Sequence, residues 1–257
     1  MTVVRAAVAA GSFYPREPAK LAALVDRLLE SAGPVTIEGR LRALVVPHAG
    51  YGYSGSVAAS AFRLVRGRRA LRVALLGPSH FSLVERAAVT EADVWRTPLG
   101  DVPVDDDLRS AALAAGATPD ERAHLGDHAL EVELPFFQRC VGDLAVTALA
   151  LGDDESALVG ALAERALVVV STDLSHYLDD ASARARDRRT ARAVVELDDG
   201  SIGGGDACGA HALRGLLLHA RRSGWTCTLL GLRTSGDATG DRSRVVGYGA
   251  FAFTSAR

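Results

Sequence analysis

Short apolar runs alternate with longer segments in which apolar residues recur at helical spacing. Runs such as 43–46 and 167–170 contain no polar residue, which predicts strands buried on both faces of a sheet. The spacing of apolar residues over 21–29 predicts an amphipathic helix. We expect strands at 3–9, 43–46, 72–76, 87–90, 102–104, 144–151, 166–170, 225–232 and 245–253, and helices at 18–29, 56–65, 105–116, 127–139, 156–165, 181–197 and 208–222. The order predicts an α/β fold in which helices flank a central mixed sheet.

Several local features sharpen this prediction. The arginine-rich stretch 66–72 is typical of a solvated turn, and the segment 95–100 of a loop. Pro135 falls inside the predicted helix 127–139 and is expected to kink it. Gly247 and Gly249 in the last predicted strand indicate close approaches of backbone.

Three predicted strands are each followed by a histidine. Pro47 ends the run 43–46 and His48 comes next, while His80 and His176 follow the runs at 72–76 and 166–170. The carboxyl ends of parallel strands meet at one edge of a sheet, where open α/β folds bind their ligands. We therefore expect these three histidines to share one site.

Composition limits the kinds of partner. The chain has 257 residues, a formal net charge of -2 and three cysteines, and it shows no internal repeat or linker. This predicts a single domain covering 1–257 that does not take nucleic acid as its default partner. No apolar run approaches the ~20 residues that cross a bilayer, and so few cysteines indicate a reduced, cytoplasmic protein. A phosphate-binding loop and a Gly-x-Ser-x-Gly elbow are both absent from the sequence.

Further candidates lie outside the strand ends. Cys208 is expected in the first turn of the helix 208–222, where the helix dipole lowers a thiol pKa and favours a metal-binding thiolate. His124 and His128 have the spacing of a two-histidine zinc helix, but Leu125 stands where such a motif has glutamate. We instead expect His128, together with Glu131, to face the strand-end site.

Five motifs in order carry a resemblance to a known family. They are Pro47-His48-Ala49-Gly50-Tyr51 with Tyr53-Ser54-Gly55, Leu76-Gly77-Pro78-Ser79-His80, Asp127-His128-x-x-Glu131, Ser171-Thr172-Asp173-Leu174-Ser175-His176, and Cys208-Gly209. Together with the opening segment 3–15, these motifs resemble the Memo family, which is also called AmmeMemoRadiSam system protein B in bacteria and archaea.

The resemblance implies a fold similar to that of class III extradiol ring-cleavage dioxygenases. It implies metal ligands at His48, His80 and Cys208, with His176 as acid or base and Asp173 supporting it. The metal is expected to be iron(II) or copper, with zinc as a further option. The expected pocket is lined by Tyr51, Tyr53, Ser79, His128 and Glu131. A loop at 50–55 is expected to form one of its walls.

Three functions remain open at this point. The first is a metal-dependent oxidoreductase, and the second is a non-catalytic module that binds a peptide or small ligand between Tyr51, Tyr53 and Trp95. The third is a zinc hydrolase, in which the metal activates a water molecule. The family name also implies an association with a radical-SAM protein.

Overall fold

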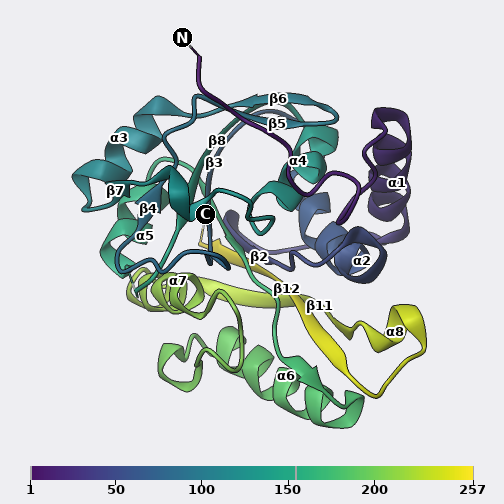
Figure 1. Ribbon diagram of the computed structural model, residues 1–257. Helices are drawn as coiled ribbons and strands as arrows, with labels where there is room; N and C mark the ends of the chain where they lie inside the picture. The colour runs from purple at the N-terminus through teal and green to yellow at the C-terminus, as the bar shows by residue number, and fades with distance from the viewer. Residues whose placement is uncertain (1, 154, 257) are drawn as a thin grey trace.

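A nine-stranded sheet forms the centre of the computed structural model, which describes residues 2–153 and 155–256 (Figure 1). The strands are β1 (Val4–Arg5), β2 (Arg40–Val46), β3 (Arg68–Gly77), β4 (Ala88–Val89), β5 (Val94–Thr97), β6 (Gly100–Pro103), β7 (Thr118–Pro119), β8 (Val141–Ala150), β9 (Leu167–Ser171), β10 (His176–Leu178), β11 (Thr226–Thr234) and β12 (Val245–Ser255). The helices are α1 (Pro18–Ser31), α2 (Tyr51–Phe62), α3 (Asp106–Ala114), α4 (Leu134–Cys140), α5 (Ser156–Ala163), α6 (Asp180–Val195), α7 (Ala210–Arg222) and α8 (Gly236–Thr239).

The middle of the sheet is parallel. β9 pairs with both β2 and β3, and β3 pairs with β8, all in parallel register. β12 then adds antiparallel to β2, and β11 and β10 pair antiparallel with β12. β1, β5 and β6 form a separate three-stranded sheet. The mixed sheet and flanking helices confirm the predicted α/β fold.

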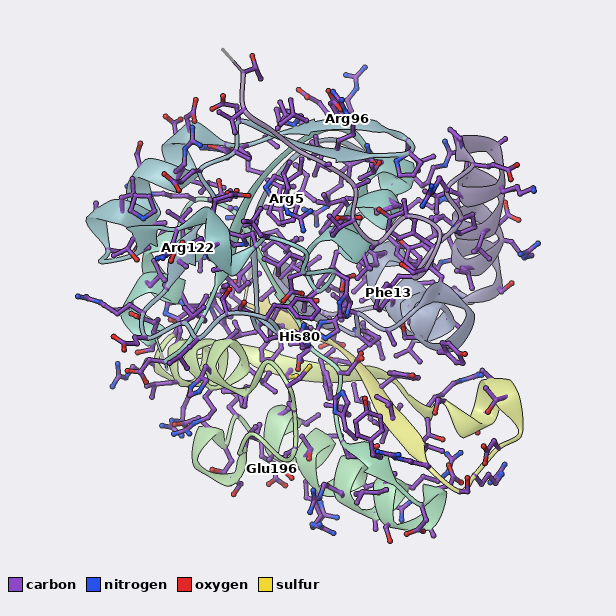
Figure 2. All side chains as sticks on the ribbon, in the orientation of Figure 1. Arg5, Phe13, His80, Arg96, Arg122 and Glu196 are labelled. Carbon is purple, nitrogen blue, oxygen red and sulfur yellow. The ribbon has the colours of Figure 1, made fainter. Side chains whose placement is uncertain are left out.

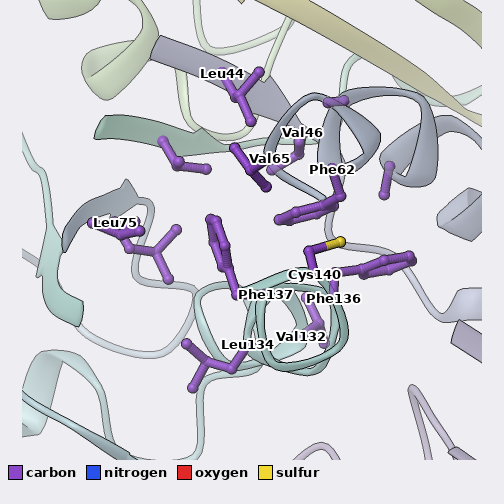
Figure 3. Packing of buried hydrophobic residues seen from close by; sticks show 14 of the residues in the cluster. Leu44, Val46, Phe62, Val65, Leu75, Val132, Leu134, Phe136, Phe137 and Cys140 are labelled. Atoms are coloured by element: carbon purple, nitrogen blue, oxygen red, sulfur yellow. The ribbon is translucent and has the colours of Figure 1, made fainter. Parts of the chain in front are cut away.

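Both faces of the central strands are covered, which explains why their sequences are apolar without alternation. Along β2, Leu44 and Val46 pack toward α1, α2 and α4, whereas Ala43 and Val45 pack toward α3, α5 and α7. Aromatic rings fill the first layer, where Phe62 and Phe136 stack with their centroids 4.8 Å apart (Figure 3). The strand ends are therefore fixed between two packed layers.

Three expectations about local structure are wrong. The stretch 66–72 is not a turn, because β3 begins at Arg68 and pairs with β8 from its first residue. The segment 95–100 belongs largely to a hairpin of β5 and β6. The segment 127–139 is not one kinked helix: a short 3-10 turn at 131–133 leads into α4, where Pro135 lies in the first turn and its missing N–H breaks no helical bond.

The segment 50–55 is also not a loop, because α2 begins at Tyr51. The amide of Tyr51 donates to the carbonyl of Phe13 and so anchors this end of the helix. The prediction at Gly247 is confirmed: a Cβ atom there would lie 1.9 Å from Oδ2 of the buried Asp187. Among the described residues, no helix has the length and apolar character required to cross a bilayer.

Candidate metal centre

Residues that follow β2, β3 and β9 line a single cleft at the carboxyl edge of the sheet. The cleft has a volume of about 650 Å³ and is bordered by His48, His80, Asp173, His176 and Cys208, among others. The ring centroids of His48 and His80 are 5.2 Å apart. The structure therefore brings together all five residues expected as metal ligands, acid or base, and support.

His48 lies fully buried at the bottom of the cleft. Its Nδ1 is 2.8 Å from Oγ of Ser171, and that hydroxyl is 2.6 Å from the carbonyl of Ala129, to which it donates. With the hydroxyl proton used in this way, Nδ1 is the donor to Ser171 and Nε2 keeps its lone pair. Burial, followed by the nearby His80, lowers the pKa of His48 well below its ordinary value, so the ring is neutral.

Asp127 fixes the orientation of His80. Its Oδ1 lies 3.1 Å from Nδ1 of His80, and its Oδ2 accepts the backbone N–H of the same residue. Burial opposes ionisation of Asp127, but its hydrogen bonds with His80 outweigh this and lower its pKa to about 2. A carboxylate that accepts from Nδ1 leaves Nε2 available, which is how metal-binding histidines are commonly oriented.

His128 is the third histidine of the cluster. Its ring stacks between those of Phe13 and His80, with centroid separations of 3.9 and 4.9 Å, and Phe13 and His80 are labelled in Figure 2. Ligand atoms of His48, His80 and His128 all lie within 4.8 Å of one another. Burial and the neighbouring His80 lower the pKa of His128 to about 4, so it too is a neutral donor.

Cys208 contacts this cluster through His48. Its Sγ is 3.2 Å from Nε2 of His48 and accepts the backbone N–H of Asp173 at 3.2 Å. The expectation that Cys208 lies in the first helical turn is wrong, because α7 begins two residues later, at Ala210. Burial and the charge of Asp173 raise the thiol pKa to about 12, the reverse of the expected lowering.

Asp173 and His176 lie on the segment that follows β9. Oδ1 of Asp173 accepts the backbone N–H groups of His48 and Ala49 at 2.9 and 3.3 Å, which fixes the turn that carries His48. Burial raises the pKa of Asp173 to about 7. Nδ1 of His176 lies 2.8 Å from the carbonyl of Leu174 and donates to it, so its Nε2 is also an acceptor.

Of the expected pocket residues, Tyr53 and His128 line the cleft. Tyr51 lies inside the protein, where its hydroxyl donates to the carbonyl of Val132. Oγ of Ser79 accepts the N–H of Ser82 and so stabilises the turn beyond β3. Neither side chain borders the cleft.

Glu131 and Trp95 belong to a separate buried network. The carboxylate of Glu131 accepts from Arg5, from the hydroxyl of Tyr14 and from two backbone N–H groups. Trp95 is also buried, and its ring centroid lies 4.0 Å from Cζ of the Arg5 guanidinium. The expectation that Glu131 and Trp95 line the pocket is therefore wrong; they hold the amino-terminal segment in place.

Two contributors to the site were given no role from the sequence. Phe13 forms part of the cleft wall although it belongs to the amino-terminal segment, which showed only a turn pattern. Asp127 stands in one of the family motifs, immediately before His128, and this position is the only signal of a role that the sequence carries. Its partner, however, is His80, which is 47 residues away in sequence.

Comparisons with known proteins agree on one family. A family model described as Memo-like protein matches residues 5–252. A MEMO1 family protein of Methanothermobacter thermautotrophicus is 33% identical over 273 residues, covering 96% of this chain and 99% of that protein. MEMO1 family proteins of Aquifex aeolicus and Archaeoglobus fulgidus are each 34% identical, with 95% of this chain and 97% of the relative covered. The matched region includes every residue of the cleft.

Proposed function

Because this chain belongs to the Memo-like protein family, we propose that it is a metal-dependent protein that holds one ion at His48 and His80. One observation carries the proposal: the Nδ1 of each ring is held by a fixed partner, Ser171 for His48 and Asp127 for His80, and the two rings offer ligand atoms within 4.8 Å of one another. Imidazoles held in this way fit a transition-metal ion, which would displace the proton that the raised pKa of His80, caused by its hydrogen bond to Asp127, favours.

We propose Cys208 as the third ligand. Its Sγ lies beside Nε2 of His48, and the N–H of Asp173 points at the sulfur and would stabilise a thiolate. A metal ion would lower the thiol pKa that burial raises, because binding requires the deprotonated form. His128 is the alternative for this position, since its ligand atoms lie within reach of both other histidines.

The donor set narrows the choice of metal. Two imidazoles with a thiolate favour iron(II), copper or zinc over magnesium or calcium, which prefer oxygen ligands. We propose iron(II) or copper first, and with either ion the metal would supply the electron-transfer chemistry of an oxidoreductase. Zinc in the same position would make the protein a hydrolase instead.

His176 and Asp173 have different proposed roles. Burial lowers the pKa of His176, so its ring is neutral at pH 7 and its Nε2 can accept a proton from a bound substrate. Asp173 acts through position, because its carboxylate is hydrogen bonded to the backbone that carries His48. The proposed acid or base is therefore His176 alone.

A second function is supported by the walls of the cleft. Phe13 and Tyr53, the latter half exposed, border a space large enough for a small molecule or a short peptide segment. A ligand held there without turnover would make the protein a binding module. We also propose, from the family resemblance, a cytoplasmic location and association with a radical-SAM protein.

The test is the metal content of anaerobically purified protein, measured by mass spectrometry for wild type and for His48→Ala, Cys208→Ser and His128→Ala. His219→Gln is the matched control, because His219 packs against Trp225 away from the cleft. We expect one ion per chain in the wild type and control, and none in His48→Ala.

The two candidates for the third ligand separate in the same experiment. Loss of metal in Cys208→Ser with retention in His128→Ala supports the cysteine, and the reverse pattern supports the histidine. Unchanged metal content in His48→Ala would refute the metal centre. A redox turnover that needs both metal and His176 separates the oxidoreductase from the binding module.

A further inference from the structure

A second depression lies at the opposite edge of the sheet, where β2, β3 and β9 begin. It has a volume of about 380 Å³ and is formed by the first residues of β2 and β3 and by the connection from α5 to β9. Its charged lining consists of five arginines and one glutamate: Arg40, Arg42, Arg68, Arg72, Arg165 and Glu164. We call these residues the arginine groove.

Most of this positive charge is not neutralised by carboxylates of the described residues. Arg72 is paired with Asp105 and Asp107. Arg40, Arg68 and Arg165, in contrast, have no carboxylate within ion-pair distance among residues 2–153 and 155–256. These three come from separate elements and meet at one hollow, where their mutual repulsion opposes the fold.

Arg42 adds a donor that lacks an acceptor. Its Nη2 donates to the carbonyl of Ala163 at 3.2 Å, and its guanidinium lies 5.3 Å from the ring centroid of Trp225. Its Nε is buried and has no hydrogen-bond partner within the part of the chain that the structure describes. Among the residues that the structure describes, no carboxylate lies within ion-pair distance of Arg42, so its charge adds to that of the three exposed arginines.

The concentration of arginine is local to this edge. The whole chain has 29 basic and 31 acidic residues, so the groove does not follow from composition. Guanidinium groups bind phosphate in two parallel hydrogen bonds, and a cluster of them suits several phosphates at once. We propose that the arginine groove binds a small ligand carrying two or more linked phosphate groups. Its volume is in the range of small-molecule sites.

The test is calorimetric titration with inorganic tripolyphosphate, using protein dialysed against EDTA so that metal in the cleft does not contribute. We expect saturable 1:1 binding at low ionic strength that weakens as salt is added. Arg40→Gln, Arg68→Gln and Arg165→Gln should each weaken binding about tenfold, as expected for one lost charge-assisted contact. These side chains are exposed, so the variants should fold.

Arg96→Gln is the matched control, because Arg96 is an exposed arginine of β5 outside the groove, and its affinity should equal that of wild type. His80→Ala tests the other edge of the sheet and should also leave the affinity unchanged. The proposal is overturned if no saturable binding occurs, if Arg96→Gln weakens binding as much as the groove variants, or if His80→Ala abolishes it. Binding to vesicles containing phosphatidylinositol bisphosphate, without binding of free tripolyphosphate, would also overturn it, because the site would then be a membrane contact.

Discussion

Replacement of Glu131 by glutamine should strongly destabilise the protein, although Glu131 does not touch the cleft. Its side chain is fully buried and forms an ion pair with Arg5 at 2.7 Å. The same carboxylate accepts the N–H groups of Val8 and Ala9, each at 2.8 Å, and the hydroxyl of Tyr14. All four partners donate, and a glutamine amide would place an NH₂ group against some of them.

The expected loss follows from two effects. Removing one charge from a buried ion pair leaves the other uncompensated, which costs about 3–5 kcal/mol. Two of the donors are backbone groups of the amino-terminal segment and can find no other acceptor without moving that segment. We therefore expect Glu131→Gln to lower the free energy of unfolding by at least about 3 kcal/mol. Tyr14→Phe, which removes a single donor to the charged group, should lose about 1.5–3 kcal/mol.

Guanidinium chloride unfolding measures both variants, and fluorescence of Trp95 reports on the same region because the indole lies against Arg5. A loss below about 1 kcal/mol in Glu131→Gln would refute the reasoning. It would mean that the carboxylate and Arg5 are not a desolvated pair in solution. A loss of metal affinity without a loss of stability would also contradict this reasoning, because Glu131 would then act at the cleft and not in the buried network.

Three further predictions concern other parts of the molecule. Asp127→Asn should reduce metal affinity about 10–100-fold, measured by competition with a chelator, because His80 loses the carboxylate that orients it. Burial lowers the pKa of His124 to about 4, so the contribution of this neutral ring to stability is complete above pH 6.5 and is lost as the pH falls toward 4. His124→Asn should therefore reduce the slope of melting temperature against pH over that range, and an unchanged slope would contradict this. Gly247→Ala should lower the free energy of unfolding by about 1–3 kcal/mol, measured by chemical unfolding, because the added methyl group overlaps Asp187. An unaltered midpoint would contradict this, because the strand would then have moved away from Asp187 without loss of stability.

The fold was predictable where the chain follows simple periodicity. The apolar runs that became β2, β3, β8 and β9 are buried on both faces, so their pattern admits few other interpretations. The start of β3 was missed because its first residues are exposed arginines, which pair through backbone alone. The start of α2 was missed because Gly52 and Tyr53 are poor helix formers. The hydrogen bond from the Tyr51 amide to the carbonyl of Phe13 stabilises the helix start there.

The site was predictable in outline for a topological reason. Histidines after parallel strands meet at one edge, so the proximity of His48, His80 and His176 follows from the order of elements. Which side of the backbone Glu131 faces does not follow from its place in a motif, and it points away from the cleft. The acidity of Cys208 was misjudged because it depends on burial and on Asp173, neither of which spacing can reveal.

The hydrogen bond between the backbone of His48 and the carboxylate of Asp173 has a consequence for how the protein matures. It joins residues 125 positions apart, and Cys208 contacts His48 across 160 positions. Pairings of such sequence separation form late, because the intervening loop must close first. On the ribosome, the nascent chain has no cleft until residues beyond 208 have emerged. An ion held by His48, His80 and Cys208, as proposed, would therefore gain its full ligand set only after that point in synthesis.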